Sequence, residues 1–379
     1  MIIIVENQSR DMKISRRLDS VPMSGIRKMF DLASSDSINL GLGEPDLAPP
    51  ASAIKGMAEA SAAGLNRYGP TAGIPELRKA VAKRHNLGEN NVMITQSGTT
   101  AIFLTIQSMI DPGDEVLIPD PGFVVYGPHT ILSGGIPKEY KLREDLIPDV
   151  DDILNGISKK TKAIFVNSPS NPTGGAIDEE TFKGICDIAE DHDITVISDE
   201  VYEPFIYEGK HITFSDVLDK AVVINGFSKM MAVTGWRMGY ILASESVLPD
   251  LIKMNYHICA GPNMPAQYGI LNALPDIDSY LKDARNVFKR RRDLISKRIN
   301  EIDNMSIIPP RGAFYAFPSY TPDIRSEDLA MELVKEGLIC TPGSAFGKNG
   351  EGHLRFSYAA DEEKINKGMD ILEKVMRRF

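Results

Sequence analysis

A single lysine interrupts an apolar run in the stretch Asn225-Gly226-Phe227-Ser228-Lys229-Met230-Met231-Ala232-Val233-Thr234-Gly235-Trp236-Arg237-Met238-Gly239-Tyr240. A short buried strand is predicted just before it, at residues 221–225, and the only tryptophan of the chain follows it. Most lysines lie on solvated faces, and burial lowers the pKa of an ammonium group. Lys229 is therefore either an ordinary structural lysine or a neutral amine that forms a Schiff base with a carbonyl. That carbonyl belongs to a substrate or to a bound aldehyde cofactor.

Short apolar runs alternate with helical patterns on the N-terminal side of this stretch. We predict strands at 92–95, 115–118, 163–167, 194–198 and 221–225, with helices from 99, near 124–132 and at 178–192. This alternation predicts an α/β domain with a mostly parallel sheet covered on both faces. Ligands bind at the carboxyl ends of strands in such sheets. The polar signatures that follow these strands are Ser97-Gly98-Thr99, Asn171-Pro172-Thr173-Gly174, Asp199 with Tyr202, and Lys229.

The pattern changes beyond Pro275, where one long amphipathic helix is predicted over 277–302. Two strands (313–317 and 353–358) and two helices (326–337 and 361–379) follow, which indicates a smaller α+β domain. We therefore divide the chain into an N-terminal extension, arm and part of the small domain (1–45), a large domain (46–275) and a small C-terminal domain (276–379). The basic run at 289–292 lies in the long helix and is predicted to face solvent.

Composition limits the classes of function that the chain can have. The 379 residues carry a net charge of −10, which argues against a nucleic-acid binder, because such a protein needs a basic face. Three widely spaced cysteines predict reduced thiols in a cytoplasmic protein and no metal site. The apolar start is too short to span a membrane and lacks the features of a signal peptide. Either Met1 or Met12 is the true start.

The run S-K-x-x-x-x-T-G-W-R-x-G-Y from Ser228 to Tyr240 resembles the lysine motif of the class I/II aminotransferases. These are fold-type I enzymes that use pyridoxal 5′-phosphate (PLP), and further landmarks of the family recur along nearly the whole chain. The resemblance implies the fold-type I PLP-dependent transferase fold, with PLP in the large domain. It also implies a ping-pong reaction through aldimines of Lys229. That reaction moves the amino group of an L-amino acid, aspartate or aromatic, to a 2-oxo acid such as 2-oxoglutarate.

The resemblance assigns a role to each polar signature, although each also has a plain structural interpretation as a cap, a turn, a filler or an ion pair. The phosphate would be held by Ser97, Gly98 and Thr99 at a strand-to-helix turn, by Ser228 and by Arg237. Asp199 would pair with the pyridine nitrogen, and Phe123 would stack on the ring. Tyr202 and Asn171 would contact the phenolic oxygen. Lys229, Asp199 and Tyr202 form the implied catalytic set.

The resemblance also implies substrate and partner contacts. Arg355 would clamp the α-carboxylate of the substrate, a task that suits a planar guanidinium. Gly43, in the loop Gly41-Leu42-Gly43-Glu44-Pro45, would place its backbone against the same carboxylate, together with Asn171. Tyr68 would cross the interface of a homodimer to the cofactor phosphate of the other protomer.

Two positions depart from the family pattern. Gly226 stands where many relatives have a phosphate-binding serine, so phosphate contact rests on Ser97, Thr99, Ser228 and Arg237. Thr99 stands where some bacterial aspartate aminotransferases have a lysine, which puts aspartate specificity in doubt. The chain is most similar to archaeal aspartate and aromatic aminotransferases. The alternatives are a PLP-dependent C–S lyase and a non-catalytic PLP-binding regulator, although eleven extra residues cannot hold a DNA-binding domain.

Overall fold

The computed structural model describes residues 15–21 and 36–379. Residues 1–14 and 22–35 of the predicted N-terminal segment (1–45), which include both candidate start residues, lie outside the described residues. The described part of that segment contains one short 3-10 helix, η1 (Arg16–Ser20).

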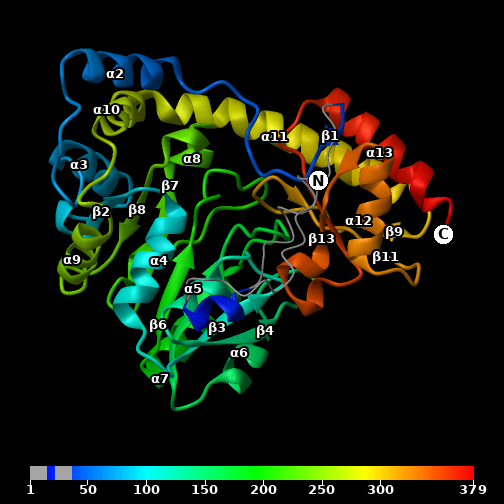
Figure 1. Cartoon of the computed structure of the whole chain (residues 1–379), viewed down its shortest axis with the longest axis horizontal. Helices are drawn as coiled ribbons and strands as arrows, with labels where there is room; N and C mark the ends of the chain where they lie inside the picture. The colour runs from blue at the N-terminus through cyan, green and yellow to red at the C-terminus, as the bar shows by residue number, and fades with distance from the viewer. Residues whose placement is uncertain (1–14, 22–35) are drawn as a thin grey trace, which may run out of the picture.

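A seven-stranded sheet forms the larger part of the molecule, with the strand order β2-β8-β7-β6-β5-β3-β4 (Figure 1). Neighbouring strands are parallel, except that β8 runs antiparallel to both β2 and β7. This confirms the predicted mostly parallel sheet. The edge strand β4, which is largely polar, and the short apolar strand β8 were not among the predicted strands. The strands are β2 (Val92–Thr95), β3 (Glu115–Asp120), β4 (Ile136–Lys141), β5 (Thr161–Asn167), β6 (Thr195–Asp199), β7 (Ala221–Gly226) and β8 (Gly239–Leu242).

Helices cover both faces of this sheet, which explains why its central strands are buried along almost their whole length. Alternate side chains of one strand join different cores: Ile94 belongs to a core that includes side chains of α3, whereas Met93 belongs to one that includes side chains of α4 and α9. The covering helices are α3 (Pro75–Arg84), α4 (Gly98–Met109), α5 (Tyr126–Leu132), α6 (Val150–Gly156), α7 (Glu179–His192) and α9 (Leu248–Cys259). Short 3-10 turns in this part are η2 (Glu89–Asn91), η3 (Phe214–Val217) and η4 (Thr234–Trp236).

A pair of helices links the sheet to the C-terminal part of the chain. Helix α2 (Ala51–Ala62) packs on α10 (Met264–Ala273). The turn η5 (Leu274–Asp276) then leads into the long helix α11 (Ile277–Asn300), which reaches from α10 to the C-terminal elements in Figure 1. None of the described helices is long and apolar enough to cross a membrane.

The C-terminal elements enclose a separate hydrophobic core with α11 from Ala284 onward. Strand β1 (Ile38–Asn39) pairs in parallel with β12 (Leu338–Ile339), so the first described strand of the chain joins this C-terminal part. The domain boundaries themselves stay a prediction. The remaining elements are β9 (Met305–Ser306), β10 (Tyr315–Ala316), β11 (Ser319–Tyr320), α12 (Ser326–Lys335), β13 (Thr341–Pro342), η6 (Gly343–Phe346), η7 (Lys348–Gly350), β14 (Leu354–Ser357) and α13 (Glu362–Met376).

The prediction that the basic run of α11 faces solvent is wrong for two of its four residues. Arg291 and Arg292 are 7% and 5% exposed. Arg291 makes a two-pronged ion pair with Asp46, at 2.6 and 2.9 Å, and Arg292 pairs with Glu208 at 2.9 Å. Helical periodicity cannot reveal these pairs, because both acids belong to loops far away in the sequence.

We expect Arg291→Met to lower the free energy of unfolding by about 2 kcal/mol, because it leaves the Asp46 carboxylate without its partner. The effect is smaller than for a fully buried pair, since the Asp46 side chain is 33% exposed and keeps some water. Urea unfolding at fixed protein concentration measures the change. Arg290→Met is the matched control, because that side chain is 64% exposed and should shift stability by less than about 0.5 kcal/mol. Equal effects of the two substitutions would contradict the assignment.

Candidate active site

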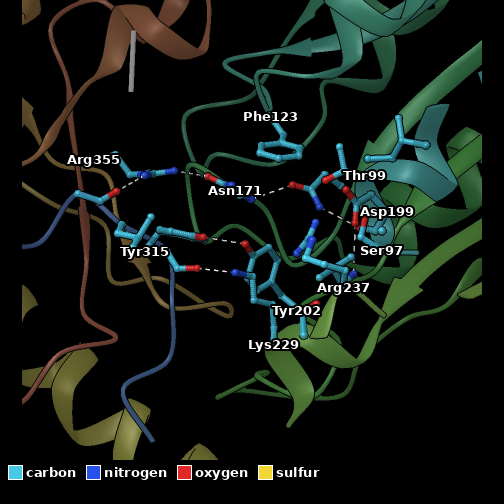
Figure 2. Close-up of a pocket in the computed structure, with 18 residues that line it drawn as sticks. Ser97, Thr99, Phe123, Asn171, Asp199, Tyr202, Lys229, Arg237, Tyr315 and Arg355 are labelled. Carbon is cyan, nitrogen blue, oxygen red and sulfur yellow. Dashed lines mark hydrogen bonds between the residues drawn. The ribbon is translucent and has the colours of Figure 1, made fainter. Parts of the chain in front are cut away.

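A cavity of about 240 Å³ opens at the carboxyl ends of β2, β5, β6 and β7. In the view of Figure 2, Arg355 and Tyr315 lie on one side of it, and Ser97, Thr99 and Arg237 lie on the other. Of the residues to which the resemblance assigns a role at the site, all but Tyr68 line this cavity. They are Gly43, Ser97, Gly98, Thr99, Phe123, Asn171, Asp199, Tyr202, Ser228, Lys229, Arg237 and Arg355.

Lys229 reaches the cavity from α8 (Phe227–Met230), a single helical turn after β7. Phe227 and Met230 are buried in the core and fix this turn, so the lysine side chain points into the cavity. Its Nζ donates a hydrogen bond to the backbone carbonyl of Gly43 at 2.5 Å. Burial lowers the pKa of Lys229 to about 8, and the positive charges of Arg237 and Arg355 act in the same direction, while Glu44 opposes them.

One end of the cavity is suited to an anion. Ser97 is the N-cap of α4, and its hydroxyl accepts a hydrogen bond from the Thr100 N–H at 3.1 Å. The free N–H groups and the dipole of the helix therefore point at this end. A Cβ on Gly239 would lie 2.6 Å from the backbone nitrogen of Gly98, so only glycine allows β8 to pack this close to the turn. Arg237 supplies a full positive charge beside it.

Asp199 is the only carboxylate among the described residues that line the cavity. It ends β6 and accepts hydrogen bonds from the Tyr126 hydroxyl at 2.8 Å and from the Val201 N–H at 3.3 Å. Burial raises the pKa of Asp199 to about 6, although both hydrogen bonds act to lower it. A cationic group placed beside Asp199 would favour its ionised form.

Arg355 projects from β14 and is 3% exposed. One of its terminal nitrogens donates to Asn171 Oδ1 at 2.8 Å, and the other donates to the Gly41 carbonyl at 2.5 Å. The guanidinium lies over the rings of Tyr315 and Phe346, at 4.7 and 4.8 Å from their centroids. Burial lowers its pKa. Within the described part of the chain, Nε has no hydrogen-bond partner and no acidic side chain pairs with this cation.

The buried position of Arg355 differs from the surface ion pair that is usual for a lone arginine in a strand. In a strand with one solvent-exposed face, a charged residue between apolar neighbours would face water. Both faces of β14 are buried along its whole length, so the guanidinium of Arg355 is buried as well. The cation is instead directed into the cavity. This is the arrangement expected of a clamp for a ligand carboxylate.

Tyr68 is 92% exposed and lies outside the cavity, in a separate hollow that Arg67, Asn263 and Met264 also line. Its contact with a second protomer therefore stays a prediction, as do the roles of the other residues. Outside the cavity, Glu200, Glu203 and His211 bring ligand atoms within 4.8 Å of one another. The buried Glu200 is already hydrogen-bonded by Ser198, His211 and the backbone of Phe214.

Three further residues bond to side chains that line the cavity and were given no role from the sequence. Tyr126 donates to Asp199, Tyr315 shares a hydrogen bond with Tyr202 at 2.7 Å, and the Gly41 carbonyl accepts from Arg355. Tyr126 and Tyr315 lie in apolar stretches, where the sequence predicts an ordinary residue of the hydrophobic core. Gly41 acts through its backbone, which no sequence pattern reveals.

Comparison with known proteins agrees with this geometry. Residues 35–372 match the family model described as aminotransferase class I and II. A probable aspartate aminotransferase of Methanocaldococcus jannaschii is 40% identical over 96% of this chain and 99% of that one. Aromatic-amino-acid aminotransferase 2 of Thermococcus litoralis is 38% identical, over 97% and 99%. The solved alanine aminotransferase of Pyrococcus furiosus superposes with a TM-score of 0.92, at 35% identity, over 97% of this chain and 100% of that one.

Proposed function

Because the chain belongs to the class I and II aminotransferase family, we propose that it binds PLP and transfers the amino group of an L-amino acid to a 2-oxo acid. The observation that carries this proposal is the largely buried amine of Lys229, which shares one cavity with the Asp199 carboxylate and the Arg355 guanidinium. These are three different chemical groups, and each suits a different part of the cofactor or the substrate.

The chemistry of the cavity fits PLP at three points. The N-terminus of α4, Ser97 and Arg237 suit a phosphate, which needs N–H donors and positive charge. Lys229 suits the aldehyde, because an amine with a pKa of about 8 has a far larger neutral fraction near physiological pH than an ordinary lysine has. Asp199 suits a protonated pyridine nitrogen, since a cation there would stabilise a carboxylate that burial destabilises.

PLP supplies, when bound, an aldehyde that condenses with amines and a ring that withdraws electrons from the α-carbon of the substrate. In our proposal Arg355 binds the α-carboxylate of the amino acid and so orients its α-carbon toward Lys229. The Nζ of Lys229 then takes the proton from that carbon and later returns a proton, acting as base and then as acid. Asp199 holds the proton on the pyridine nitrogen. Tyr202 and Asn171 direct hydrogen-bonding groups to the phenolic oxygen.

The donor, the acceptor and the assembly are also proposals. Relatives are named for aspartate, aromatic amino acids and alanine. We propose an aspartate or aromatic donor and 2-oxoglutarate as acceptor. We further propose a cytoplasmic homodimer in which Tyr68 reaches the phosphate site of the other protomer. The exposure of Tyr68 in the single chain supports this, because a fully exposed tyrosine gains from burial in an interface.

Absorption spectroscopy tests this function in a single series. The protein is purified with PLP, and L-aspartate, L-glutamate and aromatic amino acids are added in turn without any oxo acid. We expect a lasting conversion to pyridoxamine phosphate that 2-oxoglutarate reverses, and the fastest donor identifies the substrate. A spectrum that returns to its starting state with release of ammonia would identify a lyase and overturn the proposal. Failure to take up PLP would overturn it as well.

The pKa of Lys229 predicts how PLP capture depends on pH. Only the neutral amine attacks an aldehyde, so the capture rate of PLP-free protein should rise with pH and reach half of its maximum near pH 8. Stopped-flow absorption at several pH values measures this rate. Nα-acetyllysine is the control, with a midpoint near its ordinary pKa of about 10.4. A protein midpoint as high as that of the control would contradict the effect of burial.

A further inference from the structure

Two buried tyrosine hydroxyls are hydrogen-bonded to each other between the Arg355 side and the Lys229 side of the cavity (Figure 2). Tyr202 follows β6, Tyr315 lies in β10, and their oxygens are 2.7 Å apart. In Figure 2 the pair lies between Arg355 and Lys229. Burial raises the pKa of both phenols, so both stay protonated at neutral pH. Two hydrogens are therefore available to this pair, and the geometry allows either oxygen to be the donor.

The Tyr315 hydroxyl is held in place from three sides. Its ring packs under the guanidinium of Arg355 and meets the Tyr202 ring edge-on, with centroids 5.5 Å apart. Its oxygen lies so close to Gly43 that a Cβ there would be 1.9 Å from it. Tyr202 is the only hydrogen-bond partner of the Tyr315 hydroxyl among residues 15–21 and 36–379. The Tyr315 side chain is therefore fixed in position. Among the described residues, the Tyr202 oxygen is the one acceptor for the proton of the Tyr315 hydroxyl.

Counting hydrogens then fixes the direction of this bond when an acceptor is bound. Tyr202 has a single O–H, so once it donates to a ligand in the cavity it can only accept from Tyr315. Hydrogen bonds in such a chain polarise one another, and the first donor strengthens the second. We propose that Tyr315 is a positioning residue that donates to Tyr202 and thereby orients and strengthens the hydrogen bond from Tyr202 to the phenolic oxygen of PLP. This rests on the proposed function, because it requires PLP.

The proposal has a measurable consequence for the pH at which half of the lysine-bound chromophore has lost its proton, which is the midpoint of its titration. The phenolic oxygen carries more negative charge in the deprotonated state, so a stronger donor at Tyr202 stabilises that state and lowers the midpoint. The charged groups around the pair are Lys229, Asp199, Arg237 and Arg355, with Glu44 near the lysine. None of these charged groups is replaced in the variants below. A difference in midpoint between two variants therefore reports the effect of removing a tyrosine hydroxyl.

The experiment is a spectroscopic pH titration of the PLP-loaded protein and of Tyr202→Phe, Tyr315→Phe and the double variant. We expect Tyr202→Phe to raise the midpoint by about one pH unit, the size of one hydrogen bond. We expect Tyr315→Phe to raise it by about 0.3 units, since it removes only the reinforcement. The double variant should match Tyr202→Phe. Tyr358→Phe is the control, because it removes a buried hydroxyl that bonds to Ala313 away from the cavity lining.

Two results would overturn the inference. An unchanged midpoint in Tyr315→Phe would show that Tyr202 needs no second donor. A double variant with the sum of both shifts would show that the two hydroxyls act independently. Failure of the proposed function looks different, because a protein that takes up no PLP has no visible band to titrate in any variant. Each replacement removes one oxygen atom, and far-UV circular dichroism verifies that the fold is kept.

Discussion

Lys229→Ala is expected to lower kcat/KM for transamination by at least about 10⁴-fold, the upper range for one acid–base group. The reason is that no other lysine of the described chain lines the cavity, and nothing else there combines a neutral amine with access to the α-carbon. PLP itself should still bind, because Ser97, Arg237 and the N-terminus of α4 remain. The half-reaction with an L-amino acid, followed in a single turnover, measures the loss.

Borohydride reduction provides the second measurement for this variant. The unaltered protein should gain one covalent cofactor per chain, attached at Lys229, whereas Lys229→Ala should gain none after reduction. Lys183→Ala, which removes an exposed lysine of α7, is the matched control and should behave like the unaltered protein. A Lys229→Ala protein that kept either the covalent attachment or most of its activity would mean that another amine performs the reaction.

The sheet was predictable because burial on both faces leaves a direct imprint on sequence. Strand β2 was predicted with its observed bounds, and β7 differs by only one residue. Strand β4 lies at the edge of the sheet, where most of its side chains are exposed and polar, so apolar periodicity is lost. Strand β8 has four residues within a glycine-containing motif. Burial of both faces thus explains the success, and exposure explains the miss of β4. Strand β8 is as short and as buried as the correctly predicted β2, and it was missed because it overlaps the lysine motif.

The site was predictable where a residue type is unusual for its surroundings. A lysine in an apolar run and polar residues after buried strands could be found without a structure, and they do line one cavity. Tyr126 and Tyr315 could not, because a tyrosine in an apolar stretch matches ordinary core. The two-pronged pair of Arg291 with Asp46 could not either, since it joins positions far apart in the chain. Sequence patterns report local environment, whereas these contacts depend on tertiary packing.

Arg355 is a cation that the described residues compensate only in part. Burial of a charge is costly unless it is paired, and here the compensation consists of hydrogen bonds to Asn171, Gly41 and Thr341 and of two aromatic faces. Its Nε lacks a partner among the described residues. A carboxylate entering the cavity would supply the missing negative charge and further acceptors. The cost of burying the guanidinium therefore favours binding of an acid over binding of a neutral amine.

This argument predicts a selective defect in Arg355→Ala. We expect kcat/KM for an L-amino acid to fall by about 10²- to 10³-fold, the range for truncating one partner of a buried charge pair. Arg355→Lys should have a kcat/KM between those of the unaltered protein and Arg355→Ala, because lysine keeps the positive charge but lacks the planar guanidinium with its two parallel N–H donors. Phenylethylamine, which lacks the carboxylate of phenylalanine, is the matched substrate and should react equally slowly with all three proteins. Equal losses for both substrates would instead mean that Arg355 supports the fold of the cavity and does not bind the carboxylate.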